Sequence, residues 1–261
     1  MNYQRAFKDL NTAISMSHVW IHQAYHEVSA KYKRTILGSL WISGSMVATA
    51  LSMAIIFGGI FGQSLQVFFP FVLSGLIAFS MAIFPFAEGQ ETFMSNANII
   101  RNHAYPFMYY VFETVSKNVI LVMHHFVIFF IAVVLSNAFK VTHWSIILAI
   151  PLVIINMCAW TTVTAMVAAR FRDLRFLLPY VAQLFSVLTP VFWQPSQISG
   201  WRMYIVHLNP IWGLLEIIRS PLLGKAAPEQ AWILAISSCV VGIVLWLIFF
   251  PLSRRRIPFW I

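Results

Sequence analysis

Long uncharged apolar stretches dominate the chain and predict a protein that spans a lipid bilayer. No Asp, Glu, Lys or Arg occurs between Thr35 and Glu88, and the Gly62-Gln63-Ser64 break divides that stretch in two. A bilayer core about 30 Å thick takes about 20 apolar residues of helix, so each part is long enough for one crossing. The same criterion predicts six transmembrane helices, over residues 36–61, 65–87, 119–137, 145–169, 176–193 and 231–252.

The N-terminal segment has a different pattern, in which apolar side chains recur at helical spacing among polar ones. Phe7, Leu10, Ile14 and Ile21 follow that spacing, and residues 1–37 contain no Gly or Pro. We predict an amphipathic helix over 1–35 that lies in the plane of the membrane surface. A helix packed on the cytosolic part of the protein is the alternative. The segment lacks the apolar core of a secretory signal, so we expect the mature chain to keep it.

The longest connection on the cytoplasmic side, residues 88–117, mixes acids, amides and aromatics. Its first half has the composition of a short polar helix, and Tyr105-Pro106 ends it because a residue before proline is disfavoured in the helical conformation. A solvated loop is the alternative. The polar residues that single out this segment are Glu88, Glu91, Asn98 and Arg101.

The outer connection, residues 194–230, predicts a re-entrant hairpin. Its apolar part, 203–215, is too short to span a bilayer and is interrupted at Asn209-Pro210. Asparagine caps free helix amides and proline suits the first helical position, so a helix should begin there. Glu216 and Arg219 then fall three residues apart on one face and can pair. Such a pair either joins two short helices or contacts a substrate.

Composition and charge agree with this topology. The chain is 60% hydrophobic and 10% charged, and its formal net charge is +9. With both termini in the cytoplasm, four of the 17 basic residues fall outside: Lys140, Arg202, Arg219 and Lys225. This asymmetry follows the positive-inside rule, so the basic balance reflects topology and not nucleic-acid binding.

Several classes of chemistry find no support in the sequence. The Gly224-Lys225-Ala226 fragment lacks the rest of a phosphate-binding loop, so this chain should not bind ATP in that way. Hydrolase motifs and acidic clusters for a metal are missing, and we expect no metal site. His124 and His125 are adjacent in a predicted span and point about 100° apart, so structural hydrogen bonding is favoured over a proton pathway. Cys158 and Cys239 lie in predicted spans without motif spacing.

Aromatic residues are more abundant than two interfacial belts require, with 23 Phe, 10 Trp and 8 Tyr. Aromatic faces can contact the C–H side of sugars while allowing them to slide. The candidates for lining a channel are Phe57, Phe61, Phe68, Phe71, Phe79, Phe185 and Phe192. Packing against lipid or within the core is the alternative for each of them.

Three motifs in order give the chain a family resemblance. Residues 31–41, Lys-Tyr-Lys-Arg-Thr-Ile-Leu-Gly-Ser-Leu-Trp, resemble the signature that leads into the first span of polysaccharide-exporting ABC transporter permeases, the type-two ABC exporters. Residues 170–174, Arg-Phe-Arg-Asp-Leu, are similar to that family's turn between spans four and five. Asn209-Pro210 with Glu216 and Arg219 resembles its segment before the last span. The chain looks closest to membrane subunits that export O-antigen, although Ser39 stands where many relatives have proline.

The resemblance implies a homodimer in the bacterial inner membrane, paired with two copies of a separate ATPase subunit that binds ATP and magnesium. The substrate would be a lipid-linked glycan carried from cytoplasm to periplasm. Glu88, Glu91, Asn98 and Arg101 would then belong to the coupling helix that contacts the ATPase. The outer hairpin, with Asn209, Pro210, Glu216 and Arg219, would form a periplasmic gate.

Basic residues at the cytoplasmic surface add a possible substrate contact. Lys33, Arg34, Arg170 and Arg172 lie where a lipid pyrophosphate would sit in the inner leaflet, and arginine matches phosphate geometry well. Topological anchoring is the equal alternative. For the whole chain, the alternatives are a capsule or teichoic acid exporter, an ABC exporter subunit for small hydrophobic drugs or lipids, and a non-transport membrane scaffold or enzyme.

Overall fold

The computed structural model describes residues 2–33 and 40–261, and Arg34 of the predicted phosphate contact lies outside them. The described residues form helices and no strand, which confirms the predicted all-α class. Among them, five helices are long and apolar enough to cross a membrane. These are α3 (Leu40–Ile60), α4 (Leu65–Ala87), α7 (Phe107–Leu135), α8 (Ile146–Arg170) and α12 (Glu229–Ser253).

The predicted fifth span, 176–193, is shorter in the structure. Helix α9 (Leu174–Leu188) has 15 residues, about 22 Å at 1.5 Å per residue, which is less than a bilayer core of about 30 Å. The helix stops because Thr189 is extended and Pro190 follows it. The prediction of six full-length spans is therefore corrected to five and a short apolar helix.

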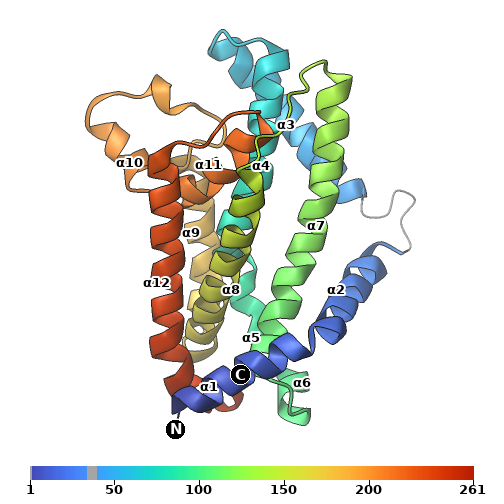
Figure 1. Cartoon of the computed structure of the whole chain (residues 1–261), viewed down its shortest axis with the longest axis vertical. Coiled ribbons are helices and arrows are strands. Elements are labelled where there is room, and N and C mark those ends of the chain that lie inside the picture. Colours follow the sequence, from blue (N-terminus) through green and yellow to red (C-terminus); the bar gives the residue numbers. More distant parts are fainter. Residues whose placement is uncertain (1, 34–39) are drawn as a thin grey trace.

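Both chain termini lie at the same end of the molecule (Figure 1), which we call the terminal end. Helix α1 (Asn2–Ser15), α5 (Thr92–Ser95) and α6 (Ala97–Asn102) lie there too. The turn between α3 and α4 lies at the opposite end, together with α10 (Met203–His207) and α11 (Pro210–Leu222). The short helices η2 (Pro195–Gln197) and η3 (Gly200–Arg202) precede α10.

The predicted single helix over 1–35 is two helices in the structure. Helix α1 runs across the lower ends of α12 and α7, and α2 (Ser17–Tyr32) then follows α7 (Figure 1). The helical geometry breaks at Met16, and the Trp20 indole donates a 2.9 Å hydrogen bond back to the Ala13 carbonyl. The break turns the chain from beneath the long helices to the side of α7.

Helix α7 begins ten residues before the predicted end of the loop at 117. The loop ends at Pro106, whose ring suits a helix start, and α7 continues through two charged residues. Glu113 and Lys117 pair across one helical turn at 2.9 Å, so the helix holds both charges without breaking. The predicted start of this span, which was set by the position of the charged residues, is therefore too late in the sequence.

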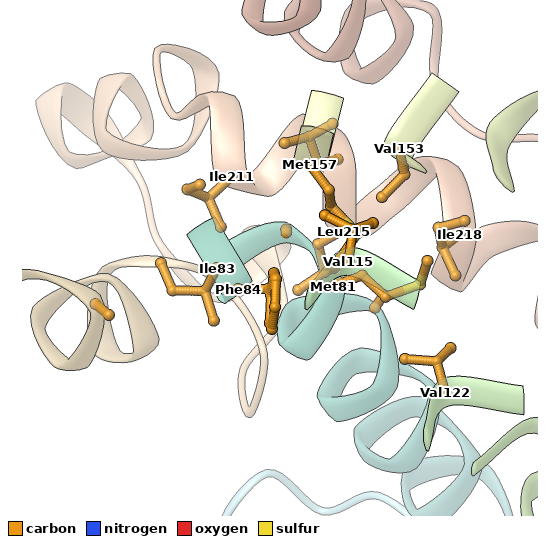
Figure 2. Packing of buried hydrophobic residues seen from close by; sticks show 14 of the residues in the cluster. Met81, Ile83, Phe84, Val115, Val122, Val153, Met157, Ile211, Leu215 and Ile218 are labelled. Carbon is orange, nitrogen blue, oxygen red and sulfur yellow. The ribbon is translucent and has the colours of Figure 1, made fainter. Parts of the chain in front are cut away.

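The core forms where α4 meets α7, α8 and α11 (Figure 2). Met81 and Phe84 of α4 face Val115 of α7, Met157 of α8 and Leu215 of α11, and all five are buried. Helix α4 is buried over most of its length, unlike α3 and α12. It is therefore the central span, and the outer hairpin packs directly on it through α11.

Gly213 sets the contact between α11 and α12. A Cβ atom there would lie 2.6 Å from the Leu234 Cβ, 2.8 Å from the Ala231 carbonyl oxygen and 3.0 Å from the Ala235 nitrogen, and the backbone of α12 cannot yield locally. We expect Gly213→Ala to destabilise the protein by about 1–3 kcal/mol, as overpacking does. Gly59→Ala is the matched control, because nothing lies within 4 Å of its added Cβ. Thermal unfolding of both variants in detergent checks this, and equal midpoints would contradict it.

Candidate functional site

The polar loop at the terminal end is packed against α8 by its first residues. Short helix η1 (Gly89–Glu91) and α5 lie on α8, and Gln90, Thr92 and Phe93 are buried. Gly89 is needed at the contact, since a Cβ there would lie 2.8 Å from the Thr161 hydroxyl of α8. The Thr92 hydroxyl closes the turn by donating to the Gly89 carbonyl at 2.6 Å. The loop is therefore a rigid extension of α8.

The predicted coupling residues divide into two groups. Glu88 and Asn98 are exposed and make no side-chain contact among those the structure resolves for the described residues. Glu91 is half-buried and accepts a 2.9 Å charged hydrogen bond from Arg175, at the start of α9. Arg101 is exposed and donates to the main-chain oxygen of Ile261. The loop thus presents an open tip while its sides are tied to α9 and to the C-terminal segment.

A buried carboxylate that no sequence pattern singles out joins three elements beside this loop. The Asp9 side chain of α1 is fully buried and accepts hydrogen bonds from the first amides of α7, Phe107 at 3.2 Å and Met108 at 3.0 Å. It also accepts a 2.6 Å charged hydrogen bond from Arg254, just after α12. Asp9 therefore caps α7 where the predicted coupling loop, residues 88–106, enters it, and fixes α1 to α12.

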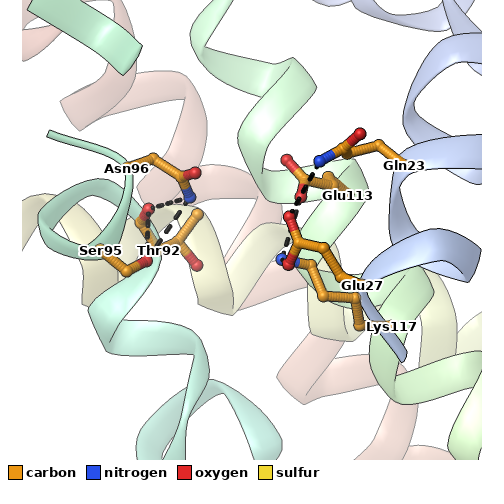
Figure 3. A network of polar contacts seen from close by, with 7 residues as sticks. All are labelled: Gln23, Glu27, Thr92, Ser95, Asn96, Glu113 and Lys117. Atoms are coloured by element: carbon orange, nitrogen blue, oxygen red, sulfur yellow. Dashed lines mark hydrogen bonds and ion pairs between the residues drawn. The ribbon is translucent and has the colours of Figure 1, made fainter. Parts of the chain in front are cut away.

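A second polar network attaches α2 to α7 (Figure 3). Lys117 of α7 contacts both Glu27 of α2, at 2.5 Å, and Glu113, at 2.9 Å, while Gln23 donates to Glu27 at 3.2 Å. Burial opposes ionisation of Glu27, but the contacts with Lys117 outweigh it and lower the pKa of Glu27. The contact is therefore fully ionic above the ordinary pKa of a glutamate and weakens as the pH falls below it.

Figure 3 also shows Asn96, at the junction of α5 and α6, folded back onto the loop. Its amide donates to the Thr92 carbonyl at 2.9 Å. This contact bends the chain between the two short helices, so that α6 projects from the loop with Asn98 and Ile99 exposed.

The outer hairpin is held by a buried arginine. Arg219 of α11 is 1% exposed, pairs with Glu216, and donates to the Pro190 carbonyl at 2.6 Å. Its guanidinium also lies 4.3 Å from the centre of the Phe71 ring of α4. The i,i+3 pairing predicted from spacing is present, and it joins α11 to α4 and to the turn after α9.

Asn209 and Pro210 start α11 as the sequence predicts. The side-chain oxygen Oδ1 of Asn209 accepts from the Ile211 amide at 3.0 Å, and Pro210 occupies the first helical position. The Asn209 amide group also donates to the Thr189 hydroxyl at 2.9 Å. One side chain therefore both caps α11 and fixes the point at which α9 ends.

Four of the candidate aromatics form a continuous ladder. Phe57, Phe61, Phe68 and Phe71 follow one another at ring-centre distances of 5.9, 6.0 and 5.7 Å, and Phe71 meets Arg219. Phe68 is fully buried within the chain, and the other three are half-buried. Phe79, Phe185 and Phe192 lie outside this ladder and are also half-buried. Lining of a channel stays a prediction for all seven.

The basic residues predicted to contact a lipid pyrophosphate, as far as the structure describes them, do not form one cluster within a single chain. Lys33 follows α2, on one side of α7, whereas Arg170 ends α8 and Arg172 follows it, on the other side (Figure 1). All three are exposed, and the Arg170 guanidinium lies 5.8 Å from the Trp260 ring centre. A phosphate contact at these residues stays a prediction.

A comparison of the chain with models of protein families shows the family to which it belongs. The family model described as ABC-2 type transporter matches residues 27–223, well over half of the chain. No curated protein matches the chain. The matched region contains the coupling loop, the short helix α9 and the outer hairpin up to the end of α11. The chain belongs to the ABC-2 type transporter family and is a membrane subunit of an ABC transporter.

Proposed function

We propose that this chain is the permease of an ATP-driven exporter that moves lipid-linked, O-antigen-like polysaccharide from the cytoplasm to the periplasm across the bacterial inner membrane. Membership in the ABC-2 family implies pairing with an ABC ATPase subunit. We place that contact at the exposed tip of the coupling loop. Glu88, Asn98 and Ile99 face solvent at the terminal end, and the rest of the loop is anchored to α8 and α9.

The terminal end is the cytoplasmic end in this proposal. Exposed basic residues gather on the segments that leave the long helices there, and positive charge marks the cytoplasmic side. These residues are Arg101, Arg170, Arg172, Arg255 and Arg256. An ATPase in the cytoplasm would then meet the loop tip directly.

Two polar side chains among the mostly apolar exposed residues of α9 support a homodimer with a path between the subunits. Helix α9 buries Ala182 alone among its residues, and it exposes Gln183 together with Tyr180, which is 68% exposed. A polar side chain facing lipid is unfavourable, so a helix of this kind faces protein or a water-filled path. The Glu91–Arg175 contact links this helix to the coupling loop, so loop movement would reach the path.

Ile99→Asp tests the docking surface. Ile99 is 43% exposed on α6, so a charge there leaves the fold intact and removes an apolar contact from the tip. We expect the ATPase subunit to co-purify at least tenfold less well, while the amount of permease in the membrane is unchanged. Val141→Asp is the matched control, because Val141 is 81% exposed and belongs to the connection between α7 and α8, which lies at the opposite end (Figure 1). Full ATPase recovery with Ile99→Asp would contradict docking at this tip.

Arg170→Gln with Arg172→Gln tests the lipid-pyrophosphate contact. Removal of two guanidinium groups should lower glycan-stimulated ATP hydrolysis several-fold while basal hydrolysis is retained. Arg255→Gln with Arg256→Gln is the control for general loss of positive charge. If both pairs of variants lose stimulation equally, the arginines act through topology rather than through substrate.

The substrate class is tested in cells. Loss of a polysaccharide exporter should cause lipid-linked polymer to accumulate in the cytoplasm, whereas loss of a drug or lipid exporter should change sensitivity alone. A capsule or teichoic acid polymer in the accumulated material would identify the corresponding alternative. Hydrolysis that small hydrophobic drugs stimulate and glycans do not would exclude the polysaccharide proposal.

A further inference from the structure

A large apolar cavity lies apart from the coupling loop and the outer hairpin. Its volume is about 900 Å³, and it is bounded by α1, α2, α7, α8 and α12. Side chains that face it include Phe112, Val119, Ile154, Trp246 and Leu247. The size is that of a binding site for a ligand of several hundred daltons.

The cavity has the depth of one bilayer leaflet. Helix α7 lines it from Met108 to Met123, about 22 Å at 1.5 Å per residue, and one leaflet with its head-group region is about 20–22 Å thick. Its lower boundary is formed by Phe7, Leu10 and Ile14 of α1, at the terminal end. The cavity therefore lies beside the hydrocarbon of the leaflet at that end.

Hydrocarbon is the occupant that the lining selects. A buried water needs two to four polar partners, and Ser116 supplies the one hydroxyl among the lining side chains. The rim is apolar and exposed, since Met123 is 63% and Ile155 50% exposed. In a bilayer this rim meets acyl chains, which can enter without losing a hydrogen bond.

Charge on the other face of α1 indicates which lipid the cavity takes. Arg5 and Lys8 are exposed within one turn of Phe7, and both line a small polar pocket with Asp9 and Arg254. Basic side chains at the membrane surface attract anionic head groups. A phospholipid with a negatively charged head group can therefore contact both faces of α1. Its acyl chains would lie against the apolar face, and its head group would lie against the basic face.

We infer that this cavity binds the acyl chains of an anionic phospholipid from the leaflet at the terminal end. The acyl chains pack between α1 and the long helices, in space that the described residues leave open. Lipid is then a structural partner of α1 and α2, alongside the contacts of Asp9 and Lys117. This inference does not depend on the substrate proposed above.

Native mass spectrometry of the purified transporter, delipidated and then incubated with phosphatidylglycerol, tests the site. Ile155→Trp fills the cavity from α8, and Ser116→Phe fills it from α7 as an independent variant. We expect either variant to retain at least fivefold less phosphatidylglycerol than the unmodified protein. Ile131→Trp is the matched control, because Ile131 is 50% exposed on α7 outside the cavity, and it should retain the lipid.

A second measurement separates lipid binding from misfolding. Delipidation should expose the junction of α1 and α2 to protease in the unmodified protein, and phosphatidylglycerol should restore protection. In Ile155→Trp the indole replaces the lipid, so protection should persist without it. Equal lipid retention in all variants would overturn the inference. So would preferential binding of a polyprenyl phosphate, or a cross-link between two copies of the chain through Ile155→Cys.

Discussion

Arg219→Ala is expected to release the outer hairpin and to lower the free energy of unfolding by about 3–5 kcal/mol, as does removal of one partner of a buried ion pair. Arg219 is 1% exposed, and its loss leaves Glu216 without a counter-charge and the Pro190 carbonyl without its donor. The contact with the Phe71 ring is lost as well. Thermal unfolding and limited proteolysis between α9 and α11 measure both effects.

Two further variants show whether the effect comes from the buried charge. Arg202→Ala removes an exposed arginine from the same region and should change stability by less than about 0.5 kcal/mol. Glu216→Gln with Arg219→Met removes both charges while keeping most of the volume, and it should recover a large part of the stability. If the double variant is as unstable as Arg219→Ala, the cause is lost packing on α4 and not an unpaired carboxylate.

Asp9→Ala is expected to lower the free energy of unfolding by about 2.5–4 kcal/mol, because loss of a helix cap costs about 1 kcal/mol and loss of a hydrogen bond to a charged group about 1.5–3 kcal/mol. The first two amides of α7 lose their hydrogen-bond acceptor inside the protein, and Arg254 loses the carboxylate with which it pairs. The junction of the coupling loop with α7 should then loosen. Amide hydrogen exchange at Phe107 and Met108 should rise with the loss of stability.

The control variants for Asp9 separate capping from charge. Asn11→Ala changes an exposed polar residue of α1 outside both pockets and should leave both exchange and unfolding unchanged. Arg254→Gln keeps the caps and removes the ion pair, so it should lower stability without raising exchange at the start of α7. Increased exchange in Arg254→Gln would show that Asp9 needs the arginine in order to cap the helix.

The long helices were predictable because apolar length alone defines them. The predicted bounds 65–87, 145–169 and 231–252 each lie within two residues of α4, α8 and α12. Local chemistry was equally predictable at the outer hairpin, where Asn209 caps α11 and Glu216 pairs with Arg219 three residues on. In each case the partners are close in sequence, so spacing is enough to place them.

The predicted span over 176–193 passed over a local signal for the end of α9, because Pro190 disfavours the helical conformation at Thr189, and a contact between distant residues reinforces that end. Leu188 is followed by Thr189 and Pro190, and the apolar side chains from Val191 to Trp193 then extend the apolar stretch past the point at which the helix stops. In the structure, Thr189 accepts a hydrogen bond from Asn209, twenty residues later. No apolar periodicity carries that information.

By itself, the sequence determined that this protein is a helical membrane protein, where most of its spans lie, and which motifs resemble an exporter family. The tertiary structure alone decided that Asp9 joins α1, α7 and the end of α12, and that Glu91 pairs with Arg175. Burial in lipid acts on every residue of a span and so leaves a repeated signal along the chain. A single charged contact between remote segments leaves one residue at each end, which no local pattern distinguishes from an ordinary polar side chain.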